Sequence, residues 1–166
     1  MAFPFIFESN FEAGTNAEWD SEADTGSLLD LPHASTLAQL NPVGVGNAAP
    51  FRGAYCMRIV MGDTNDHTLE EGDIDIAAAT TRWFRFYLWL GKDVVASADD
   101  TFNIFELQAA ASVVEGVIGL RITATTDAVE IGIGELAPTV FSAAPLEKNK
   151  WHSIEHGFVS LFNNRR

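Results

Sequence analysis

One stretch, residues 82–90, has the clearest alternation of side-chain types in the chain. Successive side chains of a β-strand point to opposite faces, so residues two apart share a face. On that period one face is purely hydrocarbon and consists of Phe84, Phe86, Leu88 and Leu90. The opposite face combines large rings with a guanidinium and consists of Trp83, Arg85, Tyr87 and Trp89. The stretch therefore predicts a strand with one core face, and its second face is either a packed interface or a binding surface.

The rest of the chain repeats this pattern on a smaller scale. Short apolar runs are separated by clusters of turn-forming residues, and no amphipathic helical period with caps stands out. The expected strands span residues 3–7, 27–31, 36–40, 54–61, 68–76, 82–90, 102–109, 117–125, 129–133, 140–141 and 150–162. The pairs Glu115-Gly116 and Thr126-Asp127 are expected to form turns. An all-β sandwich or barrel follows, and 166 residues predict one domain over 1–166.

The charge balance excludes some classes of function. The chain has 10 basic and 23 acidic residues, a net charge of -13, and phosphate binding needs clustered Lys and Arg. We therefore expect no nucleic acid as a partner. No apolar run approaches the ~18 residues needed to span a bilayer, so no membrane insertion is expected. The single cysteine, Cys56, lies in an apolar run and is expected to be a buried hydrophobe.

Four stretches occur in a characteristic order along the chain. They are Phe7-Glu8-Ser9-Asn10-Phe11-Glu12-Ala13-Gly14 with Glu18-Trp19, then Gly53-Ala54-Tyr55-Cys56-Met57-Arg58-Ile59, then Arg82-Trp83-Phe84-Arg85-Phe86-Tyr87-Leu88, then Lys150-Trp151-His152-Ser153-Ile154-Glu155. Together they resemble the concanavalin A-like (laminin G-like) jelly-roll superfamily. The resemblance implies a two-sheet antiparallel jelly-roll sandwich with residues 82–90 as a central strand. A chain ending at Arg166 would lack the last strands of that fold, and a neighbour could supply them.

The superfamily hosts lectins, glucanases, polysaccharide lyases, adhesion modules and viral surface proteins, and sugars often lie across its concave sheet. Apolar sugar faces stack on aromatic rings, while Arg and carboxylates bind hydroxyls. The candidate ligand-binding residues are Trp83, Arg85, Tyr87, Trp89, Glu106 and Arg121. The alternative is that the rings pack under residues 32–50 or against another subunit, and that Arg85 pairs with Glu106 or Glu155.

Three alternating carboxylates, Glu71, Asp73 and Asp75, would share one strand face with neighbouring Cα atoms roughly 6.6 Å apart. They resemble the Glu-x-Asp-x-Glu strand of laminarinase-type glucanases, a match that implies a nucleophile, a helper and an acid/base in that order. Asp75 is one methylene shorter than the family Glu, and Gly72 replaces a packed aliphatic residue. These departures favour a solvated acidic strand over catalysis.

A neighbouring cluster offers oxygen ligands for calcium: Asp63, Asn65, Asp66, Glu70 and Glu71. Its spacing does not match an EF-hand loop, so a solvated turn is the alternative. No other cofactor is expected.

We therefore expect a non-catalytic structural or adhesive surface module. The N-terminus has no basic segment before its short apolar run, so no signal peptide is predicted. A protein made in the cytoplasm and displayed on a particle fits a virion protein, either a capsid decoration or a tail-associated protein. Other copies or other structural proteins of the assembly would then be its partners, with glycans as candidate ligands. The alternative is an extracellular lectin or carbohydrate-active enzyme, a laminarinase-like β-glucanase or a polysaccharide lyase.

Overall fold

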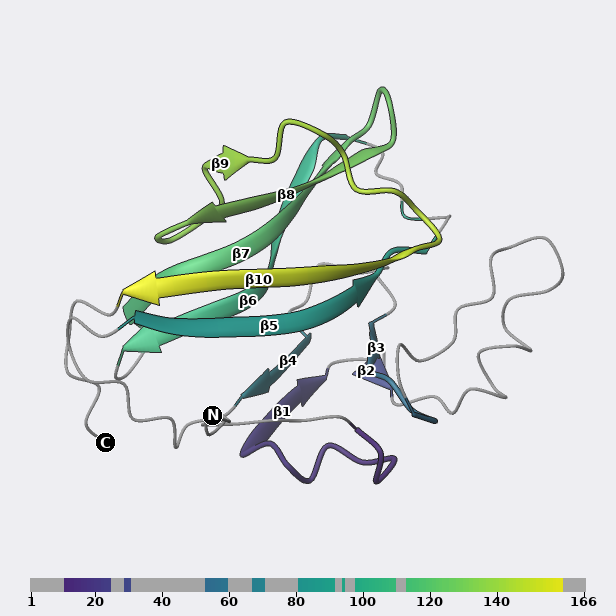
Figure 1. The fold of residues 1–166 in the computed structure, drawn as a ribbon, viewed down its shortest axis with the longest axis vertical. Helices are drawn as coiled ribbons and strands as arrows, with labels where there is room; N and C mark the ends of the chain where they lie inside the picture. The colour runs from purple at the N-terminus through teal and green to yellow at the C-terminus, as the bar shows by residue number, and fades with distance from the viewer. Residues whose placement is uncertain are drawn as a thin grey trace, which may run out of the picture. The chain divides into compact units, whose positions relative to one another are not determined.

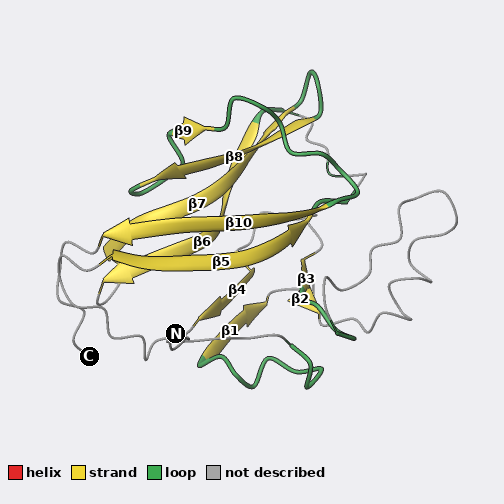
Figure 2. Cartoon of the chain, in the orientation of Figure 1, coloured by secondary structure: helices red, strands yellow, loops and turns green. Residues whose placement is uncertain are grey.

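The computed structural model describes residues 11–24, 29–30, 53–59, 67–70, 81–91, 94, 98–109 and 113–159 (Figure 1). The chain divides into two compact units, Met1–Ile74 and Asp75–Arg166, which are treated separately below. All regular structure in the described residues is β, and every strand pair is antiparallel (Figure 2). The all-β prediction is confirmed for this part of the chain, while a single domain over 1–166 stays a prediction. No described segment is a helix of the length and apolarity that a membrane span requires.

The first unit contains two short strand pairs. β1 (Ser21–Asp24) pairs with β4 (His67–Glu70), and β2 (Leu29–Asp30) pairs with β3 (Arg58–Ile59).

A polar contact joins two of the stretches on which the family resemblance rests. Both carboxylate oxygens of Glu12 lie 3.0 Å from the backbone nitrogen of Ala54, which donates to them. Gly14 has a φ of +67°, and a Cβ there would lie 2.9 Å from the ring of Tyr55. The glycine is therefore required both by its backbone conformation and by the close approach of the ring. Cys56, expected to be buried, is only half-buried.

The second unit contains two sheets. The first pairs β5 (Thr81–Trp89) with β10 (Trp151–Val159) over nine consecutive residue pairs without a register shift. The second has the order β6-β7-β8-β9, from β6 (Asp100–Ala109), β7 (Val113–Thr123), β8 (Ala128–Gly134) and β9 (Val140–Phe141). β6 has two register irregularities against β7, one between Asn103 and Phe105 and one between Leu107 and Gln108.

Aromatic contacts join these two sheets face to face. The ring of Phe105 in β6 lies 4.8 Å from the ring of Phe84 and 6.3 Å from that of Phe86, both in β5. Phe158 of β10 contacts the same ring at 5.9 Å. A second part of the core contains Leu90, Leu120, Ile122 and Val129, with Leu88 packed against it. The predicted hydrocarbon face of residues 82–90 is therefore a core face.

The prediction of a turn at Glu115-Gly116 is wrong, because both residues lie inside β7. The glycine has a packing role instead. A Cβ at Gly116 would lie 2.2 Å from Cε1 of Phe158, so the ring of β10 occupies the space that a side chain would need. The other predicted turn, at Thr126-Asp127, is present: Asp127 has a φ of 52°, and the Thr126 amide donates to the Thr123 carbonyl at 3.2 Å.

Gly119 offers a test of the packing on the outer side of β7. A Cβ there would lie 2.3 Å from Cγ of Pro138 and 2.7 Å from the carbonyl oxygen of Phe102. Because a backbone atom has to move, we expect Gly119→Ala to lower the free energy of unfolding by about 1–3 kcal/mol in urea denaturation. Gly91→Ala is the matched control, since its Cβ would meet only Val94 Cγ2, at 3.9 Å. Equal unfolding midpoints for the two variants would contradict this packing.

Candidate functional site

The outward face of β5 carries large side chains in an exposed position. Trp83, Arg85 and Tyr87 are exposed, and the residues between them are half-buried. Trp83 is 71% exposed, although tryptophan is highly buried on average. The contacts of Phe84 and Phe86 with β6 impose this orientation, because they fix the opposite face of the strand toward the core.

The register with β10 extends this surface across two strands, which lie side by side in Figure 1. Four residue pairs form what we call the aromatic face: Trp83 with Gly157, Arg85 with Glu155, Tyr87 with Ser153, and Trp89 with Trp151. At one end the rings of Trp89 and Trp151 meet edge to face, with centroids 5.7 Å apart and an interplanar angle of 61°. The aromatic face thus has tryptophan side chains at both ends and polar groups between them.

The indole of Trp83 lies flat over Gly157. A Cβ at position 157 would lie 3.4 Å from three atoms of the indole, Cδ2, Cε2 and Cε3, so the ring covers the position where a side chain would begin. The backbone of β10 therefore supports one side of the ring, and the 71% exposure of the residue leaves the other side to solvent.

An ion pair occupies the middle of the aromatic face. Nε of Arg85 donates to Oε2 of Glu155 at 2.8 Å, and Nη2 lies 2.5 Å from the same oxygen. The hydrogen bond that Arg85 donates to Glu155, followed by the negative charge of Glu155, raises the pKa of Arg85 above its ordinary value. Both side chains remain accessible, at 60% and 45% exposure. Glu106 and Glu155 were the two partners predicted for Arg85, and in the structure Arg85 pairs with Glu155.

Glu106 and Arg121 lie on a different surface. Phe105 contacts β5 and Leu107 is buried, so Glu106 between them points away from the β5–β10 sheet. It accepts hydrogen bonds from Asn103 Nδ2 at 2.7 Å and Gln108 Nε2 at 3.0 Å.

Arg121 points away from the β5–β10 sheet for the same reason, because its neighbours Leu120 and Ile122 are in the core. Its Nε donates to Glu130 Oε2 at 2.7 Å, and its guanidinium lies 4.0 Å from the ring centroid of Phe141. The six residues predicted to share one groove are therefore divided between the two outer faces of the sandwich.

The remaining candidate residues lie mostly outside the described part of the chain. This holds for the carboxylates Glu71, Asp73 and Asp75 and for the calcium candidates Asp63, Asn65 and Asp66. Glu70 ends β4, where its backbone pairs with that of Ser21. Within the described ranges no group of three or more His, Cys, Asp or Glu residues is placed to hold a metal ion.

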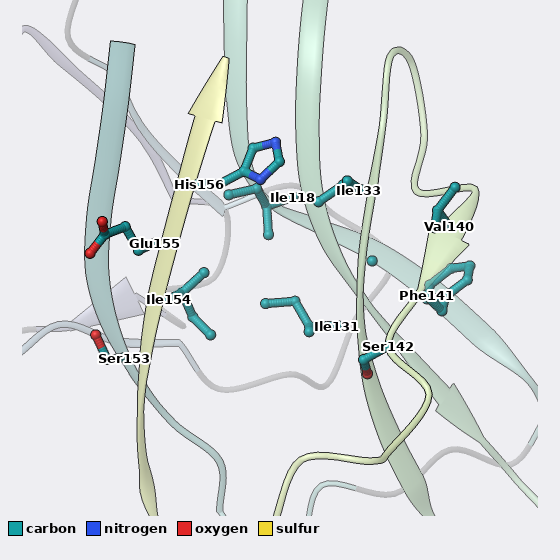
Figure 3. A pocket seen from close by; sticks show the side chains of 11 residues that line it. Ile118, Ile131, Ile133, Val140, Phe141, Ser142, Ser153, Ile154, Glu155 and His156 are labelled. Carbon is teal, nitrogen blue, oxygen red and sulfur yellow. The ribbon is translucent and has the colours of Figure 1, made fainter. Parts of the chain in front are cut away.

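A second feature, which sequence reasoning missed, is a cleft of about 370 Å³ in the second unit (Figure 3). We call it the apolar slot. It is lined by Ile118, Ile131, Gly132, Ile133, Val140, Phe141, Ser142, Ser153, Ile154, Glu155 and His156. Ile154 of β10 and Ile131 of β8 point toward one another across it, and Ile118, which is 1% exposed, lies near His156 in the same view. One sequence signal could have pointed to the slot, namely the alternation Ile131-Gly132-Ile133-Gly134. It indicates a strand with one aliphatic face, but it does not show whether another element covers that face.

Comparisons of the chain with protein-family models, with curated proteins and with solved structures gave no match.

The ion pair provides a test of whether the aromatic face is open to solvent. We expect Glu155→Gln to lower the thermal unfolding midpoint by less than about 4 °C, because exposed ion pairs contribute little. The difference from the unmodified chain should disappear at high salt in a thermal scan, since salt screens exposed charges. Glu106→Gln, on the opposite outer face, is the matched control. A large loss that persists at high salt would mean that the face is packed in the folded protein.

Proposed function

We propose that this chain is a non-catalytic surface module that binds a glycan on its aromatic face. The observation that carries the proposal is the position of Trp83, whose indole lies flat on the backbone of β10 and is 71% exposed. A ring held in this way is pre-organised for a flat apolar ligand, because little side-chain freedom is lost when the ligand binds.

The chemistry of the face matches that of a sugar. The apolar C–H face of a pyranose can stack on the indole of Trp83, and its hydroxyls can bond to the guanidinium and carboxylate of Arg85 and Glu155. Trp83 and Tyr87 are four residues apart on one strand, so their Cα atoms are separated by about 13 Å. This spacing favours an extended oligosaccharide that runs along β5 over a single sugar.

The number of carboxyl groups on the aromatic face favours binding over hydrolysis. Glycosidases generally use two carboxyl groups on either side of the scissile bond, one of which must carry a proton at some stage. The aromatic face carries one carboxyl group, Glu155, and two hydrogen bonds from Arg85 hold this group in place. The carboxylates Glu71, Asp73 and Asp75 are the alternative for an enzyme, and an assay of β-glucan hydrolysis with Glu71→Gln as control tests it.

We also propose that the two sheets of the second unit belong to a concanavalin A-like jelly roll, and that the module is displayed on a virus particle as a capsid decoration or tail-associated protein. The face-to-face antiparallel sheets support the fold, as does the contact of Glu12 with the 53–59 segment. The net charge of -13 suits a soluble surface protein. Recovery of the chain in purified particles, with its copy number measured by mass spectrometry, tests this location. Particles that lack the chain would overturn it.

A glycan array followed by calorimetry tests the binding proposal. We expect Trp83→Ala to weaken binding of the best array ligand at least tenfold, a loss of about 1.4 kcal/mol. The thermal midpoint should change little, since the side chain is mostly exposed. Leu136→Ala is the matched control, because Leu136 is 73% exposed but lies in the turn after β8, outside the aromatic face.

Two outcomes would contradict the proposal. One is binding that Trp83→Ala leaves unchanged. The other is an array without any ligand, combined with a change in oligomeric mass in the Trp83→Ala variant. That second result would identify the aromatic face as a protein interface, for which exposed Trp, Tyr and Arg residues are also suited.

A further inference from the structure

One edge of β10 faces away from β5. β10 pairs with β5 along its whole length, and among the described strands it has no partner on its other side. Every second residue of an edge strand directs its N–H and C=O away from its neighbour, and proteins usually protect such edges with bulges, Lys, Pro or short strands.

Among the described strands of the second unit, both β5 and β10 lack these protections, and β10 is the one of the two that lines the apolar slot. β6, at one edge of the four-stranded sheet, has two register irregularities, and β9, at the other edge, has only two residues. β10 is regular over nine residues and contains neither Lys nor Pro. It is therefore a suitable template for pairing with an additional strand.

The apolar slot lies beside this edge. Figure 3 shows Ile154 of β10 and Ile131 of β8 pointing into it, while Ser153 and Glu155 lie on the other side of β10. Ile133, which is 37% exposed, and Val140, which is 65% exposed, lie nearer its mouth. A strand added next to β10 would direct every second side chain toward the slot, on the same side as Ile154.

We propose that the edge of β10 accepts an extended segment of a different protein, which adds a third strand to the β5–β10 sheet. Its inward side chains are aliphatic and fill the apolar slot, and its outward side chains are basic. Backbone hydrogen bonds to the edge supply affinity in this mode of recognition, and pockets for alternate side chains supply specificity.

Charge favours this occupant over a second copy of the chain. A second copy carries the same net charge of -13 and is repelled. On the outward side the added strand lies next to Glu155, whose contacts with Arg85 use Oε2. A carboxylate has two oxygens and accepts several bonds, so a Lys or Arg opposite it gains a cross-strand charge pair.

Calorimetry with a designed peptide and the full chain tests the proposal. The probe is Lys-Val-Lys-Val-Lys-Val-Lys with blocked ends, and the first control is a peptide of the same composition with its valines grouped together. We expect the alternating peptide to bind at least tenfold more tightly than the grouped one.

Residues two apart in an antiparallel strand direct their N–H groups to the same side. Of two further peptides, N-methylated at all valines or at all lysines, one is therefore expected to lose binding and the other to retain it.

A pair of variants locates the peptide on the protein. Ile133→Lys places a charge at the slot, and Leu136→Lys adds the same charge outside it. The backbone contact of Ile133, whose carbonyl accepts from the Thr139 amide at 3.0 Å, does not depend on its side chain. We expect at least tenfold weaker peptide binding for Ile133→Lys, unchanged binding for Leu136→Lys, and similar thermal midpoints for both.

Three results would overturn the proposal. The first is no binding of the alternating peptide at millimolar concentration. The second is equal binding of both N-methylated peptides, which would mean that the slot holds an apolar group without strand pairing. The third is a dimer of the chain alone that Ile133→Lys dissociates, which would identify a second copy as the occupant. The assay contains no glycan, so its outcome is independent of the aromatic face.

Discussion

The contact of Phe105 with Phe84, Phe86 and Phe158 determines how the second unit is arranged. It joins one strand of the four-stranded sheet to both strands of the β5–β10 sheet. Large aromatic rings bury more apolar area than other side chains, so this cluster fixes which face of β5 and β10 is inward. Trp83, Arg85 and Tyr87 are outward as a consequence, and their exposure follows from the packing of their neighbours.

The sequence predicted the strands best where alternation was long. In residues 82–90 both faces were identified correctly, because hydrocarbon and polar-aromatic side chains alternate there without interruption. Gly116 was misinterpreted, because a glycine next to a charged residue has the composition of a turn. A glycine is required at position 116 because the ring of Phe158 occupies the space of a side chain there. Phe158 is distant in sequence, so only the tertiary structure shows this requirement.

The candidate groove shows a second limit of prediction from sequence. Alternation assigns each residue to one of two faces of its own strand, but it does not say which faces of different strands belong together. Glu106 and Arg121 were therefore grouped with β5 on their chemistry alone, whereas the core positions of Phe105, Leu107 and Leu120 direct both of them away from it. The apolar slot was missed for a related reason, because strand pairing determines whether an aliphatic face is covered.

The two proposed surfaces share one strand. The outward residues of β10 complete the aromatic face through Gly157 and Glu155, and its inward Ile154 lines the apolar slot. A strand added at the free edge would place its own outward side chains beside those of β10, at the border of the aromatic face. The attachment of a partner would then widen the surface offered to a glycan without changing Trp83. In this arrangement a module held in an assembly through the edge of β10 still presents the aromatic face to solvent, because pairing takes place in the plane of the sheet and ligand binding takes place above it.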